Sequence, residues 1–118
     1  VTIEPFDLRQ GVRYDLVGIR GEEFKDDERT TENIFAEAKR RGYRTPPAEV
    51  APLLRELYSQ EELGYPYVAI FHEPIPDSGG GPDVLGLHRL DVGTWLGAWS
   101  ADPRDRWHRE HLFVFLSP

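Results

Sequence analysis

Hydrophobic positions follow two different periods along this chain. Residues 12–19 place Tyr14 and Leu16 on one face of an extended segment and Val17 and Ile19 on the other, which predicts a strand. Residues 20–31 are highly charged, and Phe24 is their one large apolar side chain. This segment is therefore expected to be a loop that Phe24 anchors.

A helical period follows the charged loop. Thr30 or Thr31 can cap a helix over residues 32–41, and Gly42 can end it. A second helix is predicted over residues 47–59, where Pro52 is tolerated only if the helix begins shortly before it. The apolar stripe of this second helix has helical spacing and consists of Val50, Leu53, Leu54, Leu57 and Tyr58.

Strand patterns dominate the rest of the sequence. Residues 67–72 form a mostly apolar run that is typical of a central strand buried on both faces. Residues 73–83 are rich in proline and glycine and predict a loop. Residues 84–90 and 94–100, joined near Asp91, predict an antiparallel hairpin, and residues 112–116 predict a final strand.

Together these elements predict an α+β fold in a single globular domain over residues 1–118. The expected order is β-α-α-β-β-β-β. Short links between neighbouring strands favour a mainly antiparallel sheet of about five strands. Two helices are expected to pack on one face of that sheet.

Composition narrows the classes of function. The chain has no cysteine, which excludes disulfides, thiolate chemistry and cysteine-bound metals, and it is compatible with a cytoplasmic location. No apolar run is long enough to suggest a membrane span. The formal net charge of −7 disfavours nucleic acid as a partner and makes a basic protein the electrostatically natural one.

The histidines offer one candidate for metal chemistry. All four lie in the second half of the chain, and the i, i+3 spacing of His108 and His111 would put both rings on one face of a helix. In an extended segment the two rings would instead point to opposite faces. A divalent transition metal would need a third ligand from His72 or His88.

Two carboxylates accompany these histidines. Glu73 follows His72 directly, and Glu110 lies between His108 and His111. Either carboxylate, or His72 itself, could act as a base toward a metal-bound water in a small hydrolase. The competing interpretation is a polar connector before the last strand, with structural or solvent-facing histidines and no cofactor.

The tryptophans offer a second candidate. Trp95, Gly97 and Trp99 share one face of their strand, so the glycine leaves a shallow slot between two indoles. A planar ligand could bind there, with His88 on the adjacent strand as a third contact. The alternative is that both indoles pack in the core, which is the commoner use of large aromatic side chains.

No pattern in the sequence is a specific catalytic signature. We therefore expect a non-catalytic protein-interaction or binding domain, such as an acidic protein that neutralises a basic partner in the manner of an immunity protein or antitoxin. Two alternatives stay open, namely the metal-dependent hydrolase and a small-molecule sensor with a Trp-lined pocket.

Overall fold

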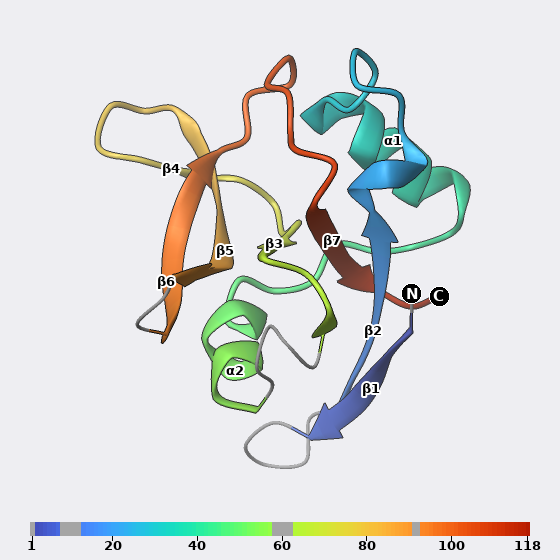
Figure 1. Ribbon diagram of the computed structural model, residues 1–118, viewed down its shortest axis with the longest axis vertical. Coiled ribbons are helices and arrows are strands. Elements are labelled where there is room, and N and C mark those ends of the chain that lie inside the picture. Colours follow the sequence, from blue (N-terminus) through green and yellow to red (C-terminus); the bar gives the residue numbers. More distant parts are fainter. Residues whose placement is uncertain (1, 8–12, 58–62, 91–92) are drawn as a thin grey trace.

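The computed structural model describes residues 2–7, 13–57, 63–90 and 93–118, and Figure 1 shows the path of the chain. Within these residues, seven strands and two α-helices follow one another, together with a short 3₁₀ helix, η2. Their bounds are β1 Thr2–Asp7, β2 Arg13–Arg20, η2 Gly21–Glu23, α1 Thr31–Arg40, α2 Val50–Leu57, β3 Tyr67–Ile70, β4 Ile75–Pro76, β5 Pro82–Leu90, β6 Gly93–Ser100 and β7 His111–Leu116.

The strands form one sheet in which β7 and β3 are central. The order runs β1-β2-β7-β3-β5, and β6 pairs with the far side of β5 while the two-residue β4 pairs with its first residues. Every pairing is antiparallel except that of β3 with β7. The predicted α+β class, the mainly antiparallel sheet and the broad order of elements are confirmed. The short strands β1 and β4 are additions to the predicted order.

The central strands are apolar on both faces. Along β7, Leu112 and Val114 belong to one buried cluster, whereas Phe113 and Phe115 belong to another. Along β3, Val68 joins the first cluster in the same way. The sheet therefore separates two hydrophobic cores, and each core needs its own cover.

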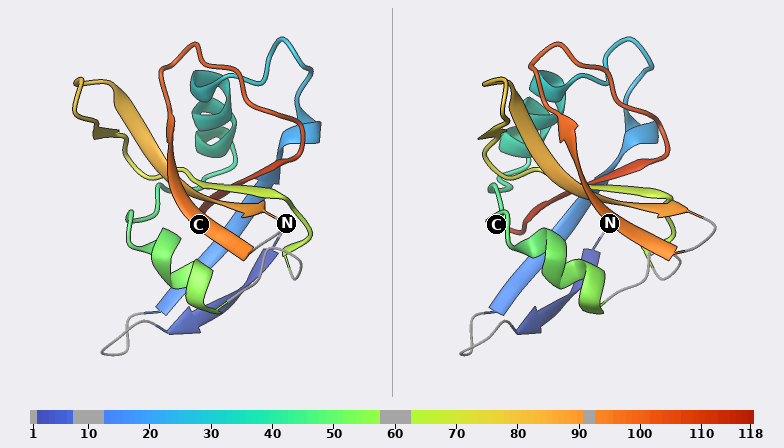
Figure 2. Two further views of the ribbon diagram at one scale, coloured as in Figure 1. Left: turned by 60° about the vertical axis from the view of Figure 1, so that its left-hand side comes forward. Right: turned by 90° about the vertical axis from the view of Figure 1, so that its left-hand side faces the viewer.

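The two helices provide that cover from opposite faces, which corrects the expectation that both pack on one face. Val50 and Leu54 of α2 lie in the cluster of Leu112, and Ile34 and Ala38 of α1 lie in the cluster of Phe113. Figure 2 shows α1 and α2 on either side of the strands. Helix periodicity identifies a buried stripe but does not say which face of a sheet that stripe meets.

Local signals explain where the helices begin and end. The Thr30 side chain accepts a hydrogen bond from the Asn33 N–H at 3.4 Å, and Gly42 follows α1 with φ 79°, so the predicted cap and stop are confirmed. Helix α2 begins at Val50, later than predicted, and Pro52 lies in its first turn. Tyr58, residue 59 and the connection at residues 91–92 lie outside the described residues.

The charged segment before α1 is anchored as expected, because Phe24 packs against the core cluster beneath α1. No helix among the described residues is long and apolar enough to cross a membrane.

Candidate ligand-binding pocket

The segment from Ala101 to Glu110 is held in place by the N-terminal end of α1. The backbone N–H groups of Thr31 and Glu32 donate to the carbonyls of Asp105 and Pro103, each at 3.1 Å. The first N–H groups of a helix have no partner inside it, so this segment satisfies donors that would otherwise face solvent. The indole N–H of Trp107 then donates to the Thr31 hydroxyl at 2.9 Å, and Trp107 is buried.

A buried arginine, Arg29, fixes the same segment through the carbonyl of Trp107. Arg29 is 5% exposed, and its guanidinium donates to the carbonyls of Gly21, Phe24 and Trp107 at 2.7, 3.0 and 3.2 Å. It also pairs with Asp26 at 2.9 Å. A buried charge is tolerated only when its donors are satisfied, and these contacts tie two loops to one side chain.

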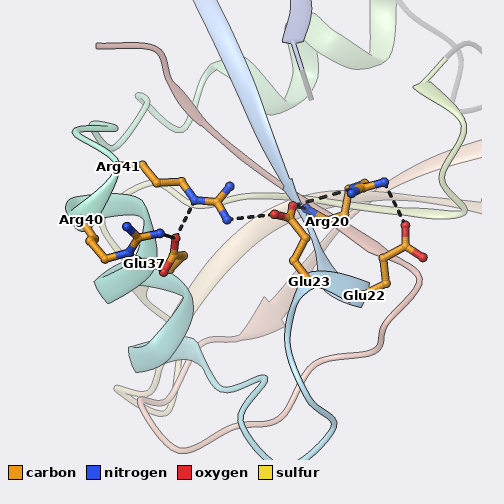
Figure 3. A network of polar contacts seen from close by, with 6 residues as sticks. All are labelled: Arg20, Glu22, Glu23, Glu37, Arg40 and Arg41. Atoms are coloured by element: carbon orange, nitrogen blue, oxygen red, sulfur yellow. Dashed lines mark hydrogen bonds and ion pairs between the residues drawn. The ribbon is translucent and has the colours of Figure 1, made fainter.

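Ion pairs hold η2 against the end of α1. Arg41 bridges Glu23 of η2, at 2.8 Å, and Glu37 of α1, at 2.6 Å. Arg20 and Arg40 extend the network at its two ends (Figure 3). Hydrogen bonds from Arg40 and Arg41 lower the pKa of Glu37 to about 2. The network therefore fixes the position of η2, and with it the carbonyl of Gly21 that Arg29 binds.

The anchored segment borders a partly open pocket of about 290 Å³ next to the end of β6 and the start of β7. This volume lies just below the usual range for ligand sites, which begins at about 300 Å³. Aromatic rings and a few polar side chains line it, namely Trp99, Ser100, Asp105, Arg106, Trp107, His108 and His111.

Three rings meet at the back of the pocket. The indole of Trp99 lies 6.1 Å from that of Trp107 between ring centroids, and the planes are nearly perpendicular. The imidazole of His111 meets Trp99 at 5.4 Å and Trp107 at 5.1 Å, again edge to face. Such T-shaped arrangements are favourable for aromatic pairs, so this wall is well packed.

His111 occupies one defined tautomer in this wall. Its Nδ1 lies 3.3 Å from the carbonyl oxygen of His108, which can only accept, so Nδ1 carries the proton in the neutral ring. Burial lowers the pKa of His111 to about 4, and the nearby charges of His108 and Arg29 act in the same direction. The ring is therefore neutral near pH 7, and Nε2 presents a lone pair.

That lone pair has no partner. Nε2 of His111 is buried and accepts no hydrogen bond from any residue that the structure describes. The residue as a whole is only 4% exposed. Buried polar atoms are usually hydrogen-bonded, so an unsatisfied acceptor in a pocket wall is a specific reason to expect a ligand there.

The predicted pair His108 and His111 does come together, but on a turn and not on a helix. The N–H of His111 donates to the carbonyl of His108 at 3.1 Å, and the turn leads directly into β7. The two imidazoles are nearly parallel, with centroids 5.9 Å apart. Tyr67 of β3 stacks on His111 at 5.1 Å and supports the arrangement from the sheet.

His88 and Trp95 form a cross-strand pair on the same face as His111. In the sheet, Tyr67 is the partner of both His111 and His88, and His88 is the partner of Trp95. The His88 ring lies 3.9 Å from the point where a Cβ on Gly97 would stand. The space over Gly97 is therefore filled by this imidazole, and the pocket lies beside Trp99 instead.

The remaining ligand candidates differ in exposure. Trp95 is 49% exposed on β6, whereas Trp99 is partly buried and packs against the core. Nδ1 of His88, like Nε2 of His111, is buried without a hydrogen-bond partner in the described part of the chain. Of the two indoles on this strand face, Trp95 is therefore the exposed one and Trp99 the packed one.

His72 lies apart from the other histidines and has a structural role. It is 2% exposed, its Nε2 accepts the backbone N–H of Leu85 at 2.9 Å, and its Nδ1 lies 2.7 Å from the carbonyl oxygen of Glu73. Because Leu85 must donate to Nε2, Nδ1 carries the proton and donates to Glu73. Both ring nitrogens are thus satisfied within the sheet.

The proposed metal ligands do not converge. Within residues 2–7, 13–57, 63–90 and 93–118, no group of three or more histidine and carboxylate side chains is placed to hold a metal ion. Glu73 is exposed beside the structural His72, and Glu110 lies in the turn between His108 and His111 and lines a separate surface hollow. A three-ligand site built on these residues would require a different arrangement.

Sequence reasoning missed three residues that shape the pocket. Sequence patterns give no role to Trp107, although it forms one wall, and they assign Asp105 and Ser100 to no site. The Ser100 hydroxyl donates to Asp105 at 2.6 Å, and the same carboxylate oxygen accepts the N–H of Asp102. The interleaved aspartates before Trp107 were a usable signal, because aspartate commonly closes tight turns.

Comparisons with known proteins add no further identification. No protein-family model matches the chain, and no match is found among curated proteins or solved structures.

Proposed function

We propose that this chain is a non-catalytic binding domain that holds a small molecule in the pocket between Trp99, Trp107 and His111. The observation that carries the proposal is the unpaired Nε2 of His111, a buried acceptor in an aromatic wall. A ligand that satisfies this atom recovers a hydrogen bond that the protein alone does not make.

The polar groups of the pocket support binding more than catalysis. A serine, an aspartate and two histidines line it, which are the residue types of a nucleophilic triad. Ser100, however, donates directly to Asp105, so its proton goes to a carboxylate that also closes the turn at Asp102. In a triad the histidine would stand between the other two groups.

A fragment screen followed by NMR tests this proposal. Small aromatic fragments are added to ¹⁵N-labelled protein, and we expect a subset of them to shift the backbone resonances of residues 99–111. The variant His108→Ala removes an exposed part of the lining and should weaken binding. Trp95→Ala, on the same strand as Trp99 but outside the lining, is the matched control. A screen in which no fragment shifts these resonances contradicts the proposal.

A protein partner is the second candidate, and the exposure of Trp95 favours it. This indole is 49% exposed on β6, a strand that pairs only with β5 in the described sheet. Exposed tryptophans are frequent anchors of protein interfaces, and the net charge of −7 favours a partner with a basic surface over nucleic acid. The acidic partner-neutralising role expected from the sequence belongs to this candidate.

Affinity purification from the native host tests the second candidate. The tagged chain should recover a basic protein in stoichiometric amount, and Trp95→Ala should reduce the recovery. Ile75→Ala is the matched control, because Ile75 is 45% exposed but pairs with the start of β5, whereas Trp95 pairs with His88 near the other end of that strand. Equal loss of the partner with both variants, or recovery of no partner, contradicts it.

A further inference from the structure

The chemistry of the pocket wall restricts which small molecules fit, provided that the pocket binds a ligand as proposed above. His111 offers an acceptor and not a donor, because its only proton, on Nδ1, is committed to the carbonyl of His108 at 3.3 Å. Its Nε2 is unpaired among the described residues and has almost no solvent-exposed surface, so a ligand donor reaches it with a small movement of the rings that cover it. A ligand that presents a second acceptor to this atom would bury two lone pairs against each other.

The aromatic rings of the wall favour an aromatic ligand. Trp99, Trp107 and His111 contribute ring surfaces, and their edge-to-face contacts hold each ring against its neighbours. Trp107 is fixed further by its hydrogen bond to Thr31. An aromatic ligand can extend this edge-to-face packing, so planar heteroaromatic molecules suit the wall.

The charges around the pocket do not favour an ion of either sign. Asp105 and Arg106 both line it and carry opposite charges, and one oxygen of Asp105 already accepts the Ser100 hydroxyl. Opposite charges at one rim give little net attraction for an anion or a cation. A neutral ligand is therefore the best match.

We infer that the pocket selects a small, neutral, flat heteroaromatic molecule with an N–H or O–H donor, and that this donor binds Nε2 of His111. The volume of about 290 Å³ suits a compact fused-ring system. Indole is a suitable probe, and benzofuran and 1-methylindole are matched molecules of similar shape that lack the donor.

The test compares these three probes by NMR titration of the ¹⁵N-labelled protein. Indole should bind at least about tenfold more tightly than benzofuran or 1-methylindole, since one hydrogen bond is worth about that factor. Binding of indole should also shift the ¹⁵N resonance of His111 Nε2, which reports directly on hydrogen bonding to that atom. Benzofuran should leave this resonance close to its position in the free protein.

The variant His111→Phe separates the donor contact from ring packing. It keeps an aromatic ring against Tyr67 and Trp107 but removes Nε2, so the preference for indole over benzofuran should disappear. If this variant does not fold, the Nε2 resonance of the unmodified protein still decides the question.

The failure of this inference is distinct from failure of the proposed function. Equal binding of indole and benzofuran at residues 99–111 overturns the donor requirement and leaves a binding pocket. Binding of neither probe overturns the ligand class, and the wider fragment screen then decides whether the pocket binds anything. Indole binding with an unchanged Nε2 resonance also overturns the inference, because the donor would lie elsewhere.

Discussion

The indole of Trp99 lies directly over Gly86 on the neighbouring strand. A Cβ added at Gly86 would overlap Cζ3 of Trp99 and would stand 2.7 Å from the carbonyl oxygen of Val68. Neither the ring nor the backbone can move away without disturbing the sheet or the pocket wall. We expect Gly86→Ala to lower the free energy of unfolding by about 3 kcal/mol, as measured by urea denaturation.

Gly97 provides the matched control, because it is the direct cross-strand partner of Gly86. A Cβ there would meet only His88, at 3.9 Å, which is an ordinary contact. Gly97→Ala should therefore leave stability unchanged or raise it by about 0.5 kcal/mol, through the smaller entropy of the unfolded chain. Similar losses in both variants would show that Trp99 does not require the glycine.

The buried imidazole of His111 makes stability depend on pH. Its pKa is about 4 in the folded protein, against 6.5 for an ordinary histidine. The unfolded chain therefore takes up the proton first as the pH falls. Stabilisation by the neutral ring is complete above about pH 6.5 and is lost progressively down to about pH 4, by roughly 3 kcal/mol in total.

Urea denaturation at pH 7, 5.5 and 4 measures this loss, and His111→Phe isolates it. Carboxylates such as Glu37, whose stabilising effect is lost as the pH falls toward about 2, contribute to both proteins alike. The unmodified protein should lose more stability than the variant between pH 6.5 and 4. Parallel pH profiles would show that His111 has an ordinary pKa in the folded state.

Arg29 has a structural role that exposed arginines lack, because its guanidinium is buried and binds three backbone carbonyls. A lysine at this position has one nitrogen and cannot reach the carbonyls of Gly21, Phe24 and Trp107 together. We expect Arg29→Lys to cost about 3 kcal/mol and to loosen the pocket segment, with faster hydrogen exchange of the Trp107 amide. The control Arg40→Lys, on the exposed face of α1, should behave like the unmodified protein. If both variants are equally stable, the carbonyl contacts of Arg29 do not contribute.

The sequence predicts the elements of this fold better than their arrangement. Alternating apolar and polar residues, and short apolar runs, identify strands such as Arg13–Arg20 and Tyr67–Ile70. The reason is that the burial of a strand is reflected in the polarity of its own residues. The side on which α1 packs is not local information. Helix α1 packs where it does because Phe113 and Phe115 lie on the face of the sheet that α2 does not cover, and they must be buried there by another element.

The pocket is harder still to predict, because it depends on contacts between distant segments. The ring of His111 is oriented by a turn at His108, and its wall is completed by Trp107, whose indole is fixed by Thr31 of α1. Arg29 gives no periodic signal that would mark it as buried. The clustering of histidine and tryptophan in the second half indicated the region, but only tertiary packing separates the structural His72 from His111.

His72 supplies a hydrogen bond that the sheet itself cannot make. The pairing of β3 with β5 ends at Ala69 and Gly86, and the carbonyl of Ile70 accepts the N–H of His72, so the Leu85 N–H of β5 donates to Nε2 of His72 instead. His72→Phe keeps a ring of similar size but leaves this buried donor unsatisfied, which should cost about 2 kcal/mol. Hydrogen exchange localises the effect, since the Leu85 amide should exchange faster than in the unmodified protein. His108→Ala, at an exposed histidine, is the control and should leave the Leu85 amide protected. Unchanged protection of that amide in His72→Phe would show that the imidazole is not its acceptor.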